Sequence, residues 1–371
     1  MDADNLWDAT TGTARRRTPG ATEGSAPHPG NRLVVTPDIT VILPVRNEGA
    51  HIEAILADLQ AQELGGLTLE MLVVDGHSED DTVSRAQAMA LADPRIRVLD
   101  NPRRLSSAAR AIGADAARGR FVAYVDGHCR LPGPSLLSDM VALFEKTGAD
   151  CLARPQPLLP QATGLMARAI AAGRTSSFGH SLRSTIYDED EHAVDPTSAG
   201  AMYRREVFER VGNFDPAFDA CEDVEFNWRV ARAGLKAWTS PKLAVRYEPR
   251  RTLGALFRQM KRYGLGRARL HRKHRSAFSL ESLIPAGFTV GLPLLLAAPL
   301  LPAPWQWVLL GPYLLYAALS FLASGVTAAR RGLALFPLLP VVFFVIHTGL
   351  GVGYLRGWVS PKPKFAPETT T

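Results

Sequence analysis

The sequence predicts an α/β domain, with a mostly parallel sheet covered by helices on both faces, followed by a C-terminal helical membrane region. Short apolar runs alternate with segments of helical periodicity across residues 37–248, which is typical of parallel sheets with crossover helices. A basic amphipathic segment follows at residues 249–278, and three long apolar runs occupy residues 279–357, where charges become rare.

Four apolar runs, each followed by a polar turn, predict the first strands. They are Ile39–Leu43, Met71–Val74, Ile96–Leu99 and Phe121–Val125. A helix with apolar residues at helical spacing is expected from Ile52, a second is capped by the turn at 76–82, and an Ala-rich helix covers Ser106–Ala117.

The next part of the chain is less regular. Cys151–Pro196 combines glycines, serines and charges without a clear period, so we expect a mobile loop region there. Order is expected to return with Ser198–Arg204 and a short helix at Glu206–Val211. Cys221–Ala233 predicts an amphipathic helix because apolar and charged positions alternate at helical spacing.

The two ends of the chain and the cysteines bear on the folded region and on the cellular compartment. Residues 1–36 are Thr, Gly, Pro, Ala and Arg without an apolar core run, which predicts a disordered leader and not a secretory signal. Residues 358–371 form a tail. Three cysteines without CxxC spacing predict no disulfide framework and a reducing compartment.

The positive charge is local. The formal net charge is +6, but Pro249–Arg275 holds ten Lys or Arg and no acid, which leaves 32 basic against 36 acidic residues elsewhere. This argues against nucleic-acid binding. Interleaved leucines and aromatics predict an amphipathic helix at anionic lipid headgroups. Two alternatives for this basic segment stay open. It could hold the phosphate of a polyprenyl-linked acceptor, or it could anchor the first membrane span.

Three apolar stretches predict membrane helices. Leu283–Leu301, Trp305–Ser324 and Leu333–Leu355 are each close to the roughly 20 residues that cross the hydrocarbon core. Arg330 and Arg331 predict a multi-pass protein of the cell membrane with its large domain on the cytoplasmic side. The basic residues from 356 to 364 would then lie outside, against the positive-inside rule, and a shallow hairpin formed by the first pair would remove this conflict.

The third stretch contains an unusual histidine and a glycine pattern. His347 is costly to place in lipid, so a hydrogen bond to another helix is expected there in preference to catalysis. Gly349, Gly351 and Gly353 predict close helix packing.

Potential ligands follow two of the predicted strands: Asp75 ends the second, and Asp126-Gly127-His128 ends the fourth. Since the C-terminal ends of parallel strands meet at the ligand-binding edge, these groups, with Pro44, Arg46 and Glu48, predict a nucleotide pocket. The sequence has no Gly-rich phosphate loop, so a divalent metal at Asp126 and His128 is expected to hold the diphosphate. An imidazole ligand favours Mn²⁺ over Mg²⁺.

A second acidic cluster, Glu222-Asp223-Val224-Glu225, opens the amphipathic helix. Ordinary N-terminal helix charge is one explanation, because the helix dipole stabilises anions there. Beside Asp126, however, the cluster supplies a general base near an anchored leaving group, as displacement at a sugar carbon requires.

In their order and spacing, four motifs resemble the family 2 glycosyltransferases of GT-A fold, and the succinoglycan-type (ExoA-like) membrane subgroup in particular. These are Pro44-Val45-Arg46-Asn47-Glu48, Asp75-Gly76-x-Ser78-x-Asp80-x-Thr82, Asp126-Gly127-His128 and Glu222-Asp223-x-Glu225. Two further segments are similar to that family: Gly212-x-Phe214-Asp215 and Gln259-Met260-Lys261-Arg262-Tyr263.

The resemblance implies a role for each matching residue. Asp223 would be the catalytic base, and Asp126 with His128 would hold a divalent metal, Mn²⁺ or Mg²⁺. Residues expected to bind the nucleotide sugar are Pro44, Arg46, Glu48, Asp75, Asp80 and Asp126, of which Glu48 and Asp80 also shape loops. Residues expected on the acceptor and diphosphate side are Gly200, Arg204, Glu222, Gln259, Arg262 and Tyr263.

Three positions depart from the family pattern. His128 stands at the usual third position of Asp-x-Asp, Ala111 stands where Asn is usual, and Tyr263 replaces Trp, which argues against processive synthesis of a long polymer. We expect an inverting, metal-dependent enzyme that moves a sugar from a nucleotide-diphosphate sugar to a membrane-associated, polyprenyl-linked or glycan acceptor in cell-surface polysaccharide or glycolipid synthesis. A catalytically degenerate membrane scaffold is the alternative. A sugar-nucleotide-forming nucleotidyltransferase is disfavoured, because it needs neither membrane helices nor a Glu222-Asp223 base.

Overall fold

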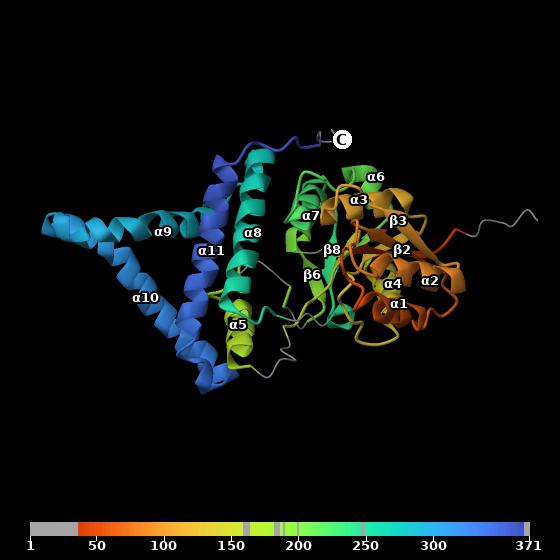
Figure 1. Cartoon of the computed structure of the whole chain (residues 1–371), viewed down its shortest axis with the longest axis horizontal. Helices are drawn as coiled ribbons and strands as arrows, with labels where there is room; N and C mark the ends of the chain where they lie inside the picture. Colours follow the sequence, from red (N-terminus) through yellow and green to blue (C-terminus); the bar gives the residue numbers. More distant parts are fainter. Residues whose placement is uncertain are drawn as a thin grey trace, which may run out of the picture. The chain divides into compact units, whose positions relative to one another are not determined.

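The structure is a computed structural model. It describes residues 36–158, 164–181, 186–187, 190–198, 200–245 and 249–366 (Figure 1). They belong to one unit that begins at Thr36. The predicted disordered leader, apart from Thr36, lies outside the described residues.

The first half of the chain alternates strands and helices as predicted. The strands are β1 (Ile39–Val45), β2 (Leu69–Asp75), β3 (Ile96–Asp100) and β4 (Phe121–Tyr124). The helices are α1 (Ile52–Gln60), α2 (Thr82–Ala92), α3 (Ser106–Ala116) and α4 (Leu136–Thr147). Every residue of β2 and β4 is buried, in line with their mostly apolar character.

The loop region predicted for Cys151–Pro196 is wrong. Its described residues form β5 (Cys151–Ala153), α5 (Leu165–Thr175) and β6 (His192–Val194). The Ala- and Gly-rich α5 buries Ile170 and Ala172 in an apolar cluster with the C-terminal helices, so its ordering depends on partners far along the chain. The remaining elements of this half are η1 (Pro196–Ser198), β7 (Met202–Arg204), α6 (Glu206–Val211), α7 (Glu222–Arg232), β8 (Ala237–Thr239) and η2 (Pro241–Leu243).

The strands form one sheet in the order β3-β2-β1-β4-β7-β5-β8-β6. From β3 to β4 all neighbours are parallel, so Asp75 and the residues after β4 lie at the same edge. The other half is mixed, because β7 runs antiparallel to β4 and β5, and β6 runs antiparallel to β8. The parallel sheet is thus confirmed for the half that carries the predicted nucleotide residues.

Apolar side chains cover both faces of the sheet. One face packs against α1 and α4, through residues such as Leu56 and Phe144. The other packs against α3, α6 and α7, through residues such as Ala109 and Phe226. At Gly113 of α3, a Cβ would lie 2.3 Å from Cγ2 of Ile42, so the glycine lets α3 approach β1 closely.

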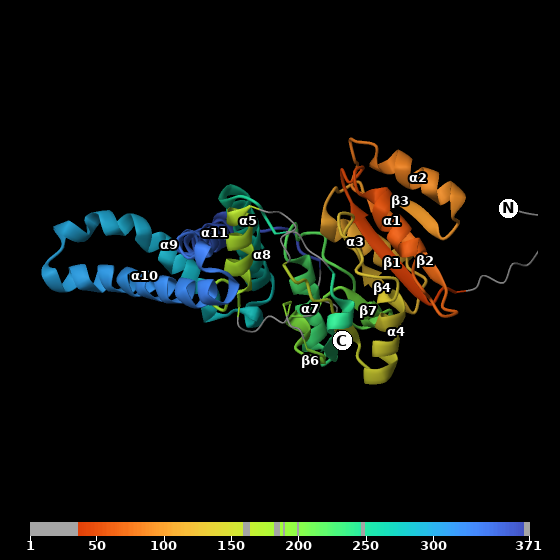
Figure 2. The same cartoon turned by 90° about the horizontal axis from the view of Figure 1, so that it is seen from below.

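The C-terminal part is helical (Figures 1 and 2). Its elements are α8 (Leu253–Lys273), η3 (Arg275–Ala277), η4 (Leu280–Ser282), α9 (Leu283–Leu294), η5 (Leu295–Leu300), α10 (Ala303–Arg331), η6 (Leu333–Leu335) and α11 (Leu339–Val359). Among the described residues, Leu280–Leu300, Ala303–Arg331 and Leu339–Val359 are long and apolar enough to cross a membrane. These match the three predicted stretches.

The glycines of α11 make the predicted close contacts. A Cβ on Gly353 would lie 2.0 Å from the carbonyl oxygen of Lys261 in α8, and one on Gly351 would lie 2.1 Å from that of Pro285 in α9. His347 lies 3.0 Å from the Tyr316 hydroxyl of α10 through Nδ1 and 3.1 Å from the Phe178 carbonyl oxygen through Nε2. The predicted hydrogen-bonding role of His347 is therefore confirmed.

Candidate active site at the edge of the sheet

Three loops converge where β1, β2 and β4 end. At Gly127 a Cβ would lie 2.9 Å from Cγ1 of Val45, so this loop lies directly against the end of β1. Nδ1 of His128 is 3.1 Å from Oε1 of Glu48, which follows β1. Asp126, His128 and Glu48 therefore gather at one edge, as the strand pattern predicted.

The Asp126 carboxylate lies between cationic side chains. Nη2 of Arg110, on α3, donates to Oδ1 of Asp126 at 3.3 Å. Burial acts to raise the pKa of Asp126, but Arg110, Arg154 and His128 outweigh it and hold that pKa below its usual value. Asp126 is therefore an anion at neutral pH, ready to bind a cation.

Arg110 also reaches the second acidic cluster. Its Nε lies 3.3 Å from Oε1 of Glu222, which also accepts a hydrogen bond of 2.9 Å from Oγ of Ser106. With 13% of its side chain exposed, Arg110 bridges Asp126 to the first turn of α7. Arg110 was not among the predicted site residues; the available signal was a single basic residue among the alanines of α3.

Asp223 occupies the first turn of α7. It is half-buried, and its Oδ1 accepts a hydrogen bond of 2.9 Å from the Val224 amide. Within the described residues its carboxylate forms no ion pair, which leaves it available as a base. Burial raises the pKa of neighbouring Glu222, with Arg110 opposing and Asp223 adding to the rise.

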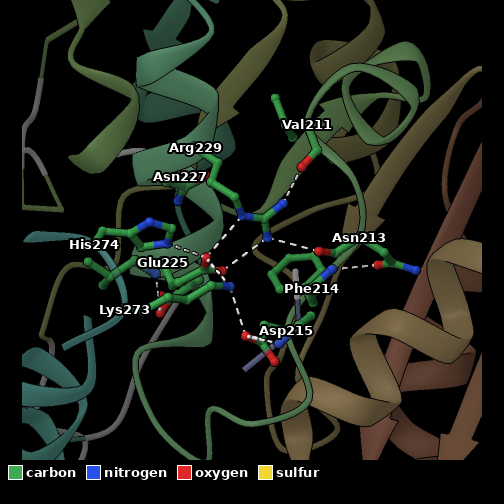
Figure 3. A network of polar contacts seen from close by, with 12 residues as sticks. Val211, Asn213, Phe214, Asp215, Glu225, Asn227, Arg229, Lys273 and His274 are labelled. Carbon is green, nitrogen blue, oxygen red and sulfur yellow. Dashed lines mark hydrogen bonds and ion pairs between the residues drawn. The ribbon is translucent and has the colours of Figure 1, made fainter. Parts of the chain in front are cut away.

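Glu225 of the same motif points elsewhere (Figure 3). It is fully buried, and its Oε1 accepts hydrogen bonds of 2.8 Å from Nζ of Lys273 and 2.8 Å from Nε2 of His274. Its Oε2 accepts one of 3.0 Å from Arg229, and Lys273 also donates to Asp215 at 2.8 Å. This network joins α7 to the end of α8, so Glu225 is structural.

The predicted Gln259–Tyr263 segment of α8 reaches the loop that precedes α7. Nη2 of Arg262 donates to the Asp219 carbonyl at 2.9 Å, and Sγ of Cys221 lies 3.6 Å from the Tyr263 carbonyl oxygen. Arg262 and Tyr263 thus support the position of Glu222 and Asp223. Gln259 is buried one turn earlier and accepts a hydrogen bond of 3.4 Å from Arg174 of α5.

Two predicted nucleotide residues hold loops in place. Asp75 accepts hydrogen bonds from Ser78 through both oxygens, at 3.0 Å from its amide and 2.5 Å from its hydroxyl. Asp80 accepts one from the Gly49 amide at 3.0 Å and two from Thr82. The loop-shaping role of Asp80 is therefore directly visible. Of the other two candidates, Pro44 lies in β1, and Arg46 is exposed just after it.

Arg204, predicted on the acceptor side, lies far from the other predicted site residues. In the β4–β7 register Arg204 lies opposite Phe121, at the end of β4 away from Asp126. Its guanidinium instead donates to the carbonyls of Ala149 at 2.8 Å and Phe144 at 2.7 Å. Gly200 lies closer to the site edge, because the next residue, Ala201, accepts a hydrogen bond of 2.7 Å from the Tyr124 amide.

The residues at this edge fit a divalent cation. Ligand atoms of Asp126, His128 and Cys129 lie within 4.8 Å of one another. Burial raises the pKa of Cys129 to about 11, and a carboxylate suits Mg²⁺ or Mn²⁺ better than a thiol does. Asp126 and His128 remain, as the sequence predicted, and an oxygen–imidazole pair suits Mn²⁺ better than Mg²⁺.

Two family models match the chain. The model described as "Glycosyl transferase family 2" matches residues 40–212, and that described as "Glycosyl transferase family group 2" matches residues 131–355. The succinoglycan biosynthesis protein ExoA of Rhizobium meliloti is 32% identical over 324 residues, which cover 85% of this chain and 93% of the relative. The chain is a family 2 glycosyltransferase.

Further relatives of this glycosyltransferase come from archaea. Glycosyltransferase AglE of Haloferax volcanii is 27% identical, over 68% of this chain and 81% of the relative. The dolichyl N-acetyl-alpha-D-glucosaminyl phosphate 3-beta-D-2,3-diacetamido-2,3-dideoxy-beta-D-glucuronosyltransferase of Methanococcus voltae is 21% identical, over 88% of this chain and 99% of the relative.

A solved structure shows the same fold. The mannosyltransferase of Pyrobaculum calidifontis, determined with GDP-Man and Mn²⁺, aligns with a TM-score of 0.55 and 20% identity over 88% of each chain. Together with the sheet topology, this confirms the predicted GT-A fold of the glycosyltransferase.

Proposed function

We propose that this glycosyltransferase moves a sugar from a nucleoside-diphosphate sugar to a membrane-associated acceptor, with inversion at the anomeric carbon. The observation that carries the proposal is the Arg110 bridge. It joins Asp126, suited to the diphosphate end of a donor, to the turn that presents Asp223. The proposed leaving-group site at Asp126 and the proposed base Asp223 are therefore held near each other, which is what in-line displacement requires.

The chain's own residues account for the proton transfer. Asp223 takes the proton of the acceptor hydroxyl while that oxygen forms a bond to the anomeric carbon. The bond from this carbon to the diphosphate oxygen breaks, and its electron pair leaves with the nucleoside diphosphate. Arg110 stands beside Asp126, where negative charge increases on the leaving group.

Asp126 and His128 would hold the divalent cation. When bound, such an ion supplies electrostatic stabilisation of the departing diphosphate. The ionised Asp126 and the nearby imidazole support this assignment, as does the Mn²⁺ in the structurally similar mannosyltransferase.

We further propose that the acceptor is polyprenyl-linked and that the enzyme works at the cytoplasmic membrane surface, in cell-surface polysaccharide or glycolipid synthesis. Three apolar helices and the basic α8 support the membrane location. Two relatives support this acceptor class, the succinoglycan biosynthesis protein ExoA and the dolichyl N-acetyl-alpha-D-glucosaminyl phosphate glucuronosyltransferase of Methanococcus voltae.

The test is release of nucleoside diphosphate from a panel of sugar nucleotides, in membranes supplied with polyprenyl-linked acceptors. Asp223→Asn is expected to lower turnover by about 10²- to 10⁴-fold, the usual contribution of a general base. Asp139→Asn is the matched control, because Asp139 also lies in the first turn of a helix, α4, away from the site. Full turnover by Asp223→Asn would remove Asp223 from the mechanism. Absence of turnover with every donor and acceptor would favour the scaffold alternative.

A further inference from the structure

We infer that α11 does not cross the bilayer. The chain enters the membrane only through the hairpin of α9, η5 and α10 and returns to the side from which it came, while α8 and α11 lie together along the leaflet surface. This inference refines the membrane attachment proposed above. The contacts at both ends of α11 carry it.

The first half of α11 packs against α5 and the segment that follows it, which lie in the chain between β5 and β6 of the sheet. At Gly173 of α5, a Cβ would lie 2.6 Å from Cγ1 of Val342. One turn further on, Nε2 of His347 lies 3.1 Å from the carbonyl oxygen of Phe178, in the segment that follows α5. The start of α11 is therefore on the catalytic side of the membrane.

The chain that follows α11 also contacts the catalytic region. The amide of Ala366 donates to Oδ2 of Asp215 at 3.0 Å, and the rings of Phe365 and Phe218 are 5.6 Å apart. The six residue steps from Ser360 to Ala366 span at most about 22 Å when fully extended. This is less than the roughly 30 Å hydrocarbon core, so a tail emerging on the far side could not reach back to Asp215.

The partner of α11 is unsuited to lipid. α8 runs alongside α11 in the same direction, since Gly353 meets the carbonyl of Lys261 and Gly357 meets that of Leu265, four residues later in each helix. A charged side chain at the bilayer centre costs about 3 kcal/mol or more. If α11 crossed, it would carry with it the cationic residues of α8: Arg258, Lys261, Arg262, Arg267, Arg269, Arg272 and Lys273.

The hairpin of α9, η5 and α10, unlike the α8–α11 pair, is suited to lipid. Only 11% of the apolar window is buried in each of its two arms, against 50% for α11. At the rise per residue of their helix types, α9 and η5 together extend about 30 Å, enough to cross the hydrocarbon core. Both views show the hairpin extending away from α8 and α11 (Figures 1 and 2). Leu296, Leu300 and Trp305 near its tip are 84%, 84% and 61% exposed.

Charge at the base of the hairpin agrees with a surface position for the α8–α11 pair. A cavity of about 440 Å³ at the C-terminal end of the pair is lined by His271, Arg272, Arg275, Phe278, Trp358 and Lys362. Cationic and aromatic side chains are typical of the headgroup level. With two crossings, Arg330, Arg331 and Arg356 all lie on one side, and the conflict with the positive-inside rule disappears.

The experiment compares two single-cysteine sites in the full chain. Leu91→Cys marks the catalytic region, where Leu91 is 91% exposed on α2, and Lys364→Cys marks the exposed tail. The native Cys129, Cys151 and Cys221 are buried, so the unsubstituted protein gives the background. A membrane-impermeant maleimide is applied to intact cells and to inverted vesicles, and detergent-solubilised samples give the labelling maximum.

We expect both cysteines to label in inverted vesicles and both to be protected in intact cells. Labelling of the two sites from opposite sides would overturn the inference, because it requires an odd number of crossings. Labelling of both in intact cells would support two crossings while contradicting the cytoplasmic placement proposed above. Turnover does not enter this measurement, so failure of the proposed sugar transfer would leave the topology result standing.

Discussion

Glu222 and Asp223 differ from Glu225 in surroundings, although the three acids share the first turn of α7. Glu222 accepts a hydrogen bond from Ser106 at the site edge, and Asp223 keeps a carboxylate without an ion pair among the described residues. Glu225 is fully buried among Arg229, Lys273 and His274 (Figure 3). One short motif therefore contains both the proposed base and the residue that attaches α7 to α8.

The difference shows how one part of the site can be held in place while another stays accessible. We call the accessible part, around Asp126 and Asp223, the open edge. The buried network around Glu225 satisfies its charges internally, so it holds α7 against the end of α8 without solvent or ligand. At the edge around Asp126, by contrast, 29% of the Asp126 side chain is exposed and Asp223 forms no ion pair among the described residues, so these carboxylates remain accessible to a cation and a polar substrate. The predictions below test this division, from the largest expected effect to the smallest.

Removing divalent metal should affect only the open edge. Chelation with EDTA is expected to reduce nucleoside diphosphate release to background, and added Mn²⁺ should restore it, because Asp126 and His128 would hold the cation at the diphosphate. The thermal unfolding midpoint should barely change, since the Glu225 network uses only protein charges. Full turnover in EDTA would contradict the metal assignment.

Glu225→Gln should destabilise the fold. Removing this carboxylate leaves Lys273 and His274 buried without their anion, at a cost of about 3–5 kcal/mol in the free energy of unfolding. Chemical denaturation in detergent measures it, with exposed Glu209→Gln on α6 as the control, expected within about 0.5 kcal/mol of the unsubstituted protein. Equal stability of the two variants would show that the network does not hold α7.

Arg110→Met should weaken the open edge. The change removes the charge-assisted hydrogen bond to Asp126, usually worth about 1.5–3 kcal/mol, together with the ion pair to Glu222, so turnover should fall by about 10- to 100-fold. Arg110→Lys keeps the charge but cannot reach both carboxylates, and an intermediate loss is expected in the same assay. Unchanged turnover in Arg110→Met would show that the bridge between Asp126 and Glu222 is not needed for sugar transfer.

The stability contributed by Glu225 should depend on pH. Burial acts to raise its pKa, but His274, Arg229 and Lys273 lower it from the usual 4.5 to about 2. A lowered pKa in the folded state gives stability that is complete above the usual value and is lost as the pH falls from 4.5 towards 2. The stability gap to Glu225→Gln should therefore narrow by about 1.4 kcal/mol per pH unit below 4.5. A gap that is constant between pH 7 and pH 3 would contradict this.

The parallel half of the fold could be predicted because its signals are local. β1 and β2 are dense in Val, Ile and Leu, β4 is Phe-Val-Ala-Tyr, and each gives way to a polar loop. α5 could not be predicted, because its Ala-rich face is ordered by α11, whose Val342 comes much later in the chain. β7 is three residues long and shows no alternation that would reveal its antiparallel direction.

The site was predictable where the chain presents ligands at strand ends, as at Asp126 and His128. Arg110 was missed because one arginine on an Ala-rich helix looks like an ordinary solvent-facing residue. The contrast between Asp223 and Glu225 was also hidden, although Arg229 four residues after Glu225 offers a signal for an ion pair. The position of Arg204 was not predictable, because a sequence motif does not tell which end of an antiparallel strand lies at the site.

The most direct test asks whether Asp223 serves catalysis while Glu225 serves stability. It compares Asp223→Asn with Glu225→Gln in one preparation and measures nucleoside diphosphate release per folded molecule. We predict that Asp223→Asn loses about 10²- to 10⁴-fold in turnover while keeping its unfolding free energy. Glu225→Gln is expected to keep turnover per folded molecule within a few fold. Full turnover by Asp223→Asn, with Glu225→Gln inactive though folded, would contradict the account.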